Sequence, residues 1–380
     1  MKHIDLFLFA GEHSGDIHGE ALIKELLKIN PRLKISGVGG PRMRSAGLEC
    51  ILPMEEFQVM GFIDVLKSLK KLKKHYYFLQ NALLKSKPKG IITIDYPGFN
   101  LRLIRSLSKK NISSKLIHYI CPSVWAWGKG RIKVMEKHLD HLLTILPFEQ
   151  ELFNPHLLKT SFVGHPLIEK VNSHKYDSNW KTTYGIDEKK NIITIFPGSR
   201  AHEINKNLSK QLEIAKRLAT SYKNLDIIIS CADDHLAPLI AQKGANIPII
   251  PQKHLYEVMR ATHLAISTSG TVTLELALHH IPTIVTYTIN PVDCFIAKNI
   301  LRINMPYYSL PNIILSNQVF PEFFGPQFTI DNAFEKASEF IISEYKRNNC
   351  IELCQSLNGI LSNKNAGKES AKIVLESINC

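Results

Sequence analysis

Two loops in the second half of the 380-residue sequence combine hydroxyl, acidic and basic side chains with small residues, directly after an apolar run. The first follows the run ending at Phe196 and contains Ser199 and Arg200, with Glu203 one turn later. Small residues let the backbone approach a ligand, a helix start offers free N–H groups, and arginine adds a cation. This loop therefore fits an anion such as a diphosphate, and an ordinary serine N-cap is the alternative.

The second loop, at 267–275, repeats this arrangement after another apolar run. Hydroxyl and N–H groups at a helix start can hold phosphate, and Glu275 can accept hydrogen bonds from sugar hydroxyls. Two such loops in one half of the chain predict a nucleotide-sugar pocket. A plain capping segment with a solvated Glu275 is the alternative. The candidate ligands in this loop are Ser269, Gly270, Thr271, Thr273 and Glu275.

A lone carboxylate, Asp95, directly follows the apolar run from Gly90 to Ile94. At the carboxyl edge of a sheet it is positioned to act as a general base. An Asx-turn before Pro97 is the other interpretation. The loops at 11–16 and 37–41 also follow apolar runs, but neither completes the G-x-G-x-x-G pattern, so an NAD site is not expected.

Two of the three tryptophans lie between Tyr119 and Trp127, beside a basic stretch. Indole rings at a strand end can line an acyl or sugar pocket, and core packing is the competing interpretation. Ser123 and Trp125 are the candidates from this stretch.

The segment from Val59 to Leu84 separates apolar and lysine residues at helical spacing. This pattern is typical of a basic amphipathic helix on an anionic membrane, where each lysine contributes about 1 kcal/mol. A surface helix with a solvated lysine face is the alternative. The expected membrane surface comprises Val59, Phe62, Leu66, Lys67, Leu69, Lys70, Lys71 and Lys74.

The composition is that of a folded protein with a basic surface, because the formal net charge is +13 and hydrophobic residues make up 44% of the chain. No nucleic-acid motif accompanies the charge, so no nucleic-acid partner is expected. The seven cysteines are odd in number and scattered, which indicates reduced thiols in a cytoplasmic protein. No metal-ligand spacing, signal peptide or apolar stretch of about 18 residues is present, so neither a metal site nor a membrane-spanning helix is expected.

Apolar runs alternate with helical patterns along the chain, which predicts parallel strands covered by helices on both faces. The predicted class is α/β, with two doubly wound Rossmann-like domains facing an interdomain cleft. We expect an N-terminal domain at 1–172, a linker at 173–190, a nucleotide-binding domain at 191–345 and C-terminal helices at 346–380 that pack back on the first domain. The predicted strands are 5–10, 35–38, 90–94, 115–120, 141–145, 192–196, 225–230, 247–250, 264–266 and 283–286, and the predicted helices include 16–29, 201–221, 254–261 and 273–279.

Nine motifs in order give the sequence a family resemblance. It resembles lipid-A-disaccharide synthase, an inverting glycosyltransferase of lipopolysaccharide assembly with a GT-B fold. The motifs are Gly11-Glu12-x-Ser14-Gly15-Asp16, Gly37 to Pro41, Asp95-x-Pro97-x-Phe99-Asn100, Pro122 to Trp127, Pro147-Phe148-Glu149, Val163 to Pro166, Pro197 to Arg200, Ser269-Gly270-Thr271-x-Thr273-Leu274-Glu275 and Ser309-Leu310-Pro311-Asn312.

The resemblance implies transfer of 2,3-diacylglucosamine from UDP-2,3-diacylglucosamine to the 6-hydroxyl of 2,3-diacylglucosamine 1-phosphate, giving a β(1→6) disaccharide and UDP without a cofactor. It implies that Asp95 is the base and that Arg200 stabilises the leaving UDP. It also suggests a homodimer, and a peripheral location on the cytoplasmic face of the inner membrane. The expected donor residues are Ser199, Arg200, Glu203, Ser269, Gly270, Thr271, Thr273, Glu275 and Asn312, and the expected acceptor-side residues are Glu12, Ser14, Asp16, Ser123 and Trp125.

One position departs from the family pattern, because Gly98 stands where a second acid is common. Asp95 is therefore expected to act alone, or with Glu12 or Asp16. Two other functions stay open: another GT-B enzyme such as a UDP-N-acetylglucosamine 2-epimerase, and a peripheral lipid-binding protein without catalysis.

Overall fold

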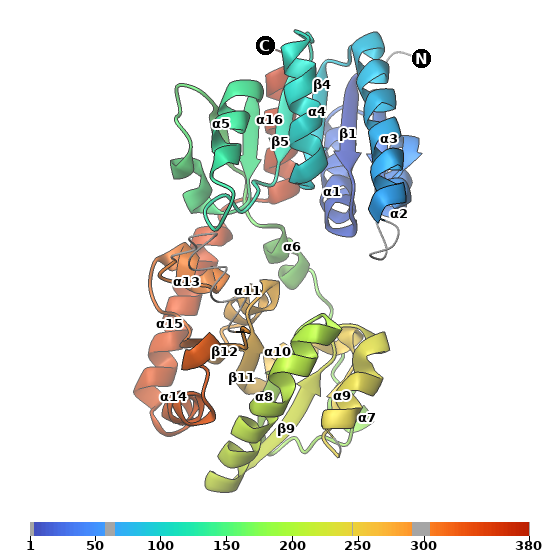
Figure 1. Ribbon diagram of the computed structural model, residues 1–380. Coiled ribbons are helices and arrows are strands. Elements are labelled where there is room, and N and C mark those ends of the chain that lie inside the picture. The colour runs from blue at the N-terminus through green and yellow to red at the C-terminus, as the bar shows by residue number, and fades with distance from the viewer. Residues whose placement is uncertain (1–3, 58–64, 245, 291–304, 380) are drawn as a thin grey trace. The chain divides into compact units, whose positions relative to one another are not determined.

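The chain folds into two units, each built around one parallel β-sheet (Figure 1). The computed structural model describes residues 4–57, 65–244, 246–290 and 305–379, with the backbone alone at 65–69. Unit 1 comprises Met1–Pro166 and Ser362–Cys380, and unit 2 comprises Leu167–Leu361. The last helix of the chain therefore belongs to the first unit.

Unit 1 contains a seven-stranded sheet in the order β3-β2-β1-β4-β5-β6-β7, with every neighbouring pair parallel. Parallel neighbours need a crossover between them, and the helical stretches of the sequence supply it. The strands are β1 (Leu6–Ala10), β2 (Ile35–Gly39), β3 (Glu49–Pro53), β4 (Gly90–Ile94), β5 (Lys115–Tyr119), β6 (His141–Thr144) and β7 (Lys159–Phe162).

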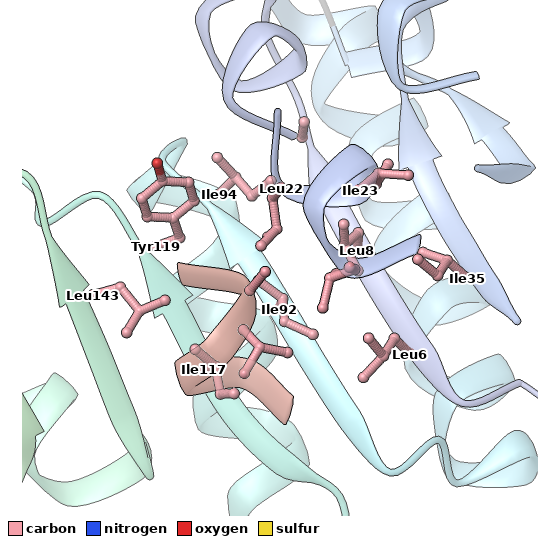
Figure 2. Close-up of a cluster of buried hydrophobic side chains, with 14 of the residues drawn as sticks. Leu6, Leu8, Leu22, Ile23, Ile35, Ile92, Ile94, Ile117, Tyr119 and Leu143 are labelled. Atoms are coloured by element: carbon pink, nitrogen blue, oxygen red, sulfur yellow. The ribbon is translucent and has the colours of Figure 1, made fainter. Parts of the chain in front are cut away.

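Alternate residues of the first strand fill two separate cores, one on each face of the sheet. Leu6 and Leu8 join a cluster with helix α1 and the C-terminal helix α16, as Figure 2 shows for the α1 side. Phe7 and Phe9 point to the other face and pack with residues of α3, α4 and α5. A strand that is buried on both faces reads as a continuous apolar run, which is why the sequence reveals it.

The helices of unit 1 divide between the two faces of its sheet (Figure 1). One face carries α1 (His13–Ile29), α2 (Pro41–Ser45) and α16 (Ala366–Ile378), and α16 packs directly against α1 and β5. The other face carries α3 (Val65–Ser86), α4 (Pro97–Lys109) and α5 (Gly130–His138). Two 3-10 turns, η1 (Met54–Phe57) and η2 (Pro147–Leu152), complete the unit.

Unit 2 contains a six-stranded parallel sheet in the order β10-β9-β8-β11-β12-β13. Its long helix α8 (Ala201–Ser221) packs on the sheet and on α14. The strands are β8 (Asn191–Phe196), β9 (Leu225–Ser230), β10 (Ile249–Ile250), β11 (Thr262–Thr268), β12 (Thr283–Tyr287) and β13 (Glu322–Phe324). The other helices are α6 (Pro166–Asn172), α7 (Trp180–Thr183), α9 (Ala237–Lys243), α10 (Leu255–Ala261), α11 (Thr271–Leu278), α13 (Leu310–Leu315), α14 (Ile330–Ile342) and α15 (Glu344–Leu361), with 3-10 turns η3 (Asp234–Leu236), η4 (Gln252–His254) and η6 (Gly325–Gln327).

Each sheet reverses its strand order once, and the reversal marks a natural binding position. In unit 1 the reversal lies between β1 and β4, and in unit 2 between β8 and β11. Loops that leave the carboxyl ends of such strands diverge to opposite faces, which opens a crevice at that edge. The loops after these four strands are the ones whose residues the sequence singles out.

The predicted α/β class with two Rossmann-like sheets is confirmed. The unit boundary differs from the expected one, because the segment 173–190 contains α7 and is part of unit 2. Of the C-terminal helices, α15 belongs to unit 2 and α16 to unit 1. The sequence analysis also missed three strands, β3, β7 and β13, whose residues are mostly half-buried or exposed and form no apolar run.

Candidate functional site

The carboxyl groups of Asp95 and Glu12 meet at the strand reversal of unit 1. Asp95 directly follows β4 and Glu12 follows β1 by two residues. Burial, together with the neighbouring charge of Glu12 and a hydrogen bond to it, raises the pKa of Asp95 to about 6. A hydrogen bond between two carboxyl groups needs a proton, so the pair holds one proton more readily than separate acids do.

The backbone that carries Asp95 is held in an uncommon conformation. Asp95 and Tyr96 have φ values of 45° and 49°, in the left-handed region that residues with a Cβ rarely adopt. The N–H of Asp95 donates to the carbonyl of Tyr119 at 2.9 Å, and Asn100 Nδ2 donates to the carbonyl of Asp95 at 2.6 Å. Neighbouring strands and helices thus fix a strained turn that sets the direction of this carboxyl group.

The second carboxylate of the 11–16 loop, Asp16, binds backbone N–H groups of a neighbouring loop. It is fully buried, and its oxygens accept the backbone N–H groups of Gly40, Arg42 and Met43 at 2.8, 3.1 and 3.0 Å. A Cβ on Gly40 would lie 2.4 Å from Asp16 Oδ2, so this position needs glycine. These contacts of Asp16 are structural, and the acceptor-side role expected of it stays a prediction.

The remaining expected acceptor-side residues lie at different places. Ser14 Oγ donates to Glu12 Oε1 at 3.1 Å and so belongs with the carboxyl pair. Trp125 packs edge-to-face on Phe148 with ring centroids 5.8 Å apart, and Ser123 is exposed beside it. The cavity next to Glu12 is lined by neither Ser123 nor Trp125, and their part in acceptor binding stays a prediction.

Unit 2 holds a cavity of about 320 Å³ at its own strand reversal. It is formed by the loop after β8 and the loop after β11, the two stretches that the sequence predicts as ligand loops. Most of the predicted donor residues meet here. They are Ser199, Arg200, Glu203, Ser269, Gly270, Thr271 and Glu275.

Glu203 fixes the first of these loops. Its Oε2 accepts the N–H of Ser199 at 3.0 Å, and its Oε1 accepts Arg200 Nη1 at 2.9 Å. Gly198 has a φ of 115°, and a Cβ there would lie 2.6 Å from Glu203 Oε2. The Arg200 side chain is 69% exposed, so its remaining N–H groups are free to meet an anion.

Glu275 lies on α11, and a tyrosine hydroxyl and a lysine contact its carboxylate. Its Oε1 accepts the hydroxyl of Tyr256 at 2.9 Å and lies 3.5 Å from Lys170 Nζ. Burial and this carboxylate raise the pKa of Tyr256 well above its ordinary value, so the hydroxyl stays a donor. The other carboxylate oxygen is available to a ligand in the cavity.

Two expected donor residues do not line this cavity. Thr273 is buried, and its hydroxyl donates to the carbonyl of Gly270, three residues earlier, at 2.8 Å. Asn312 is also buried, where its Nδ2 donates to Glu322 Oε1 at 2.9 Å and its Oδ1 accepts the N–H groups of Val319 and Phe320. Both side chains hold the backbone around them, and the direct contact with a ligand expected of them stays a prediction.

Sequence reasoning missed several residues that complete the cavity. Ser230 ends β9 and Gln252 follows β10, and both line the cavity beside the predicted loops. Both residues lie at or just after the carboxyl end of a strand, and this position in the sequence indicates a place at the ligand edge, since the carboxyl ends of parallel strands share one edge of the sheet. Tyr256 and Lys170 gave no such signal, because they reach Glu275 from distant segments.

Helix α3 carries part of the expected membrane surface. Lys70, Lys71 and Lys74 are exposed, and Lys71 Nζ lies 2.7 Å from Glu56 Oε2. Val59 and Phe62 lie outside the described residues, as do the side chains of Leu66, Lys67 and Leu69. From Leu79 onward the apolar stripe of α3 is core, because Leu79 and Leu83 are buried against α4.

Two further properties concern metals and membranes. Within residues 4–57, 65–244, 246–290 and 305–379, no three His, Cys, Asp or Glu side chains lie close enough together to hold a metal ion. In the same ranges, every helix is too short or too polar to cross a bilayer.

Comparison with known proteins identifies close relatives of the chain. It is 40% identical over 358 residues to a lipid-A-disaccharide synthase of Chlamydia pneumoniae, covering 92% of this chain and 59% of that protein. It is 32% identical over 340 residues to the lipid-A-disaccharide synthase of Geobacter sulfurreducens, covering 88% of this chain and 87% of that one. The chain thus spans about three-fifths of the length of its chlamydial relative.

Solved structures share the fold at low sequence identity. A UDP-GlcNAc 2-epimerase from Neisseria meningitidis bound to UDP-GlcNAc superposes with a TM-score of 0.59 at 12% identity, covering all of both chains. A glycosyltransferase from Rickettsia africae gives a TM-score of 0.59 at 11% identity, covering 100% of this chain and 98% of that one. These likenesses agree with the GT-B type fold expected from the sequence.

A family model described as "Lipid-A-disaccharide synthetase" matches the chain from residue 6 to residue 374. The match includes both strand reversals, the Glu12–Asp95 pair and the cavity of unit 2. Together with the identities to the chlamydial and Geobacter proteins, this shows that the chain belongs to the lipid-A-disaccharide synthetase family.

Proposed function

We propose that the chain is an inverting glycosyltransferase that makes the lipid A disaccharide. The acceptor is 2,3-diacylglucosamine 1-phosphate and the donor is UDP-2,3-diacylglucosamine. The acceptor 6-oxygen forms a bond to the donor anomeric carbon, the bond from that carbon to the diphosphate breaks, and the 6-hydroxyl proton goes to a carboxylate. The products are the β(1→6) disaccharide 1-phosphate and UDP.

The observation that carries this proposal is the Glu12–Asp95 carboxyl pair. A base for a hydroxyl proton works best when its pKa lies near the working pH. The pKa of Asp95, about 6, leaves the carboxyl group ionised at neutral pH and more basic than an ordinary aspartate. Asp95 accepts the proton, and Glu12 raises its affinity for that proton.

The cavity of unit 2 is the proposed UDP-sugar site. Among the described residues no side chain caps the start of α11, which leaves the N–H groups of Thr271 and Val272 for phosphate oxygens, and the exposed Arg200 adds positive charge. As UDP departs, negative charge grows on its diphosphate, and these groups stabilise that charge. The Neisseria epimerase, which has the same fold, binds UDP-GlcNAc and supports a uridine nucleotide as the ligand.

The test measures UDP release from UDP-2,3-diacylglucosamine in detergent, with and without the acceptor, for the wild type and Asp95→Ala. We expect acceptor-dependent release by the wild type, and a disaccharide product by mass spectrometry. Asp95→Ala should still bind UDP but release none. UDP release without a disaccharide would indicate an epimerase-like or hydrolytic reaction and reject the proposal. Parallel reactions with EDTA and with Mg²⁺ report whether a metal takes part.

We further propose that the first half of α3 binds an anionic membrane surface on the cytoplasmic side of the inner membrane, where both acylated substrates reside. The exposed lysines Lys70 and Lys74 supply the attraction, at about 1 kcal/mol each. Co-sedimentation with phosphatidylglycerol vesicles should fall about tenfold or more in Lys70→Gln/Lys74→Gln. Lys85→Gln on the same helix is the matched control, and equal loss in both variants would contradict the proposal.

The homodimer suggested by the family resemblance belongs to the same proposal. Sedimentation velocity in detergent distinguishes a species of 43.1 kDa from one of twice that mass. A single monomeric species across micromolar concentrations would contradict the dimer.

A further inference from the structure

A second large cavity in unit 1 lies beside Glu12, over the start of α4 and against α3. Its volume is about 800 Å³, more than twice that of the cavity in unit 2. Its lining is unusual in chemistry, since four aromatic rings and two basic side chains surround a single carboxylate. The lining residues are Glu12, Leu72, Lys73, Tyr76, Tyr77, Tyr96, Pro97, Gly98, Phe99 and Arg102.

The aromatic wall of this cavity is rigid. Phe99 stacks on Phe9 with ring centroids 5.0 Å apart and meets Phe57 and Tyr76 edge-to-face at 5.3 and 5.9 Å. The Tyr96 hydroxyl donates to the carbonyl of Phe57 at 3.0 Å. An apolar chain that enters here finds a preformed surface, and little side-chain entropy is lost on binding.

The basic side of the cavity is available to an anion. Arg102 and Lys73 are both exposed, and in the described part of the chain neither side chain forms an ion pair with a carboxylate. The single acid of the lining is Glu12, which neighbours Asp95. The cavity thus combines the acid beside the proposed base with two cationic side chains.

The cavity is open next to Gly98. Gly98 precedes Arg102 by four residues, one turn or about 6 Å along the helix axis. A Cβ added to Gly98 would meet no atom of the described residues within 4 Å, so the space next to this position is open among them. In a pyranose 1-phosphate the 6-hydroxymethyl group and the anomeric phosphate stand on the two carbons that flank the ring oxygen, so one cavity can contact both groups.

We propose that this cavity binds the phosphorylated acceptor, with Arg102 and Lys73 holding its anomeric phosphate and the aromatic wall holding one of its acyl chains. This inference rests on the proposed function and extends it, because it names the residues that recognise the acceptor.

The first experiment compares two acceptors, 2,3-diacylglucosamine with and without the 1-phosphate, in the wild type and in Arg102→Gln. A charge-assisted contact predicts that removing the phosphate lowers wild-type kcat/KM for the acceptor about 10- to 100-fold. Arg102→Gln should cause a similar loss on the phosphorylated acceptor and little further loss on the other. The donor KM should not change.

Arg105→Gln is the matched control, because Arg105 is exposed on the same helix and is not part of the cavity lining. It should behave as the wild type on both acceptors. Equal loss on both acceptors in Arg102→Gln, or no loss, would overturn the inference while wild-type activity still supports the proposed function. Absence of acceptor-dependent UDP release in the wild type would instead reject the proposed function itself.

The second experiment fills the space above Gly98. Gly98→Leu places a side chain in the open cavity, and glycine to a larger residue is favourable inside a helix, so the melting temperature should not fall. The acceptor KM should rise at least tenfold while the donor KM stays the same. Gly98→Ala should show a smaller rise. An unchanged acceptor KM in Gly98→Leu would overturn the inference independently of Arg102.

Discussion

The strand reversals of the two units occupy the same place in their sheets but use acidic residues in opposite ways. In unit 2, Glu203 and Glu275 are surrounded by donors: a backbone N–H, an arginine, a tyrosine hydroxyl and a lysine. In unit 1, Glu12 faces another acid, and the pKa of Asp95 rises. A carboxylate that accepts hydrogen bonds from donors holds the loop around it in place, whereas a carboxylate beside a second carboxyl group has a higher pKa and binds a proton more tightly. One topology therefore places carboxylates in two different electrostatic settings, which fit the proposed binding site and the proposed base.

Replacing Asp95 tests this contrast with the largest expected effect. General-base catalysis is typically worth 10²- to 10⁴-fold, so Asp95→Asn should lower kcat by about 10³-fold and leave UDP affinity unchanged. Kinetics and calorimetric titration with UDP measure the two quantities. A variant that loses UDP binding as well would mean that Asp95 serves the donor side, and the contrast between the units would fail.

The same substitution should stabilise the protein at alkaline pH. The folded chain holds the Asp95 proton more tightly than the unfolded chain, so this residue's contribution to stability is complete below about pH 4 and is lost as the pH rises through 6. Asp95→Asn cannot lose this contribution. It should exceed the wild type by roughly 2 kcal/mol at pH 8 and match it at pH 4 in thermal denaturation. Equal stability at both pH values would argue against a raised pKa.

Replacing Asp16, in the same loop as Glu12, should lower stability and leave catalysis unchanged. Asp16→Asn turns an acceptor of three backbone N–H groups into a partial donor, which should cost about 3 kcal/mol of stability. The folded fraction should retain kcat. Thermal denaturation and active-site titration with UDP separate the two effects. A loss of kcat at full folding would return Asp16 to the acceptor site.

On the donor side, Gly198→Ala should weaken binding without touching the base. The added Cβ would crowd Glu203 Oε2 at a φ of 115°, and the loop would have to move. We expect the donor KM to rise about tenfold, in line with 1–2 kcal/mol of strain, with the acceptor KM unchanged. Gly359→Ala is the control in the same unit, because a Cβ there meets no atom within 4 Å. An equal effect of both variants would refute this role of the loop.

The smallest expected effect concerns the pH profile. The acidic limb of kcat/KM should fall near pH 6, where Asp95 takes up its proton. In Glu12→Gln the opposing charge is gone, so the pKa of Asp95 drops and the limb should move by about 1 pH unit toward acid. Glu25→Gln on α1 is the control for a general change in charge. A limb that stays at pH 6 in Glu12→Gln would attribute the raised pKa to burial alone.

The sequence predicts the features of this structure that depend on residues close together in the chain, and it does not predict contacts between distant segments. Apolar runs of buried strands and the periodicity of long helices are local, so ten of the strands and the helices α1, α8, α10 and α11 are predicted to within a few residues, whereas β3, β7, β13 and several short helices are not. The alternation of strands and helices predicts which loops meet at a strand reversal, and most of the expected donor residues do line one cavity there. The backbone partners of Asp16 and Asn312 lie at other loops and cannot be predicted locally, because the sequence does not distinguish a polar loop residue that binds a ligand from one that binds backbone. Their expected ligand contacts stay predictions. The Glu12–Asp95 contact was one of several alternatives, since the sequence shows both acids but not their distance.

The docking of α16 onto α1 also determines when unit 1 can finish folding on the ribosome. Its core includes Ala371 and Val374, which are synthesised only after all of Leu167–Leu361. At about 5–20 residues per second, the first 166 residues wait on the order of 10–40 s for the helix that closes their sheet. During this interval an apolar face of β4 and β5 stays uncovered. Nascent unit 1 is therefore a natural client for chaperones, and loss of the last helix should send the chain to proteolysis before it affects any substrate.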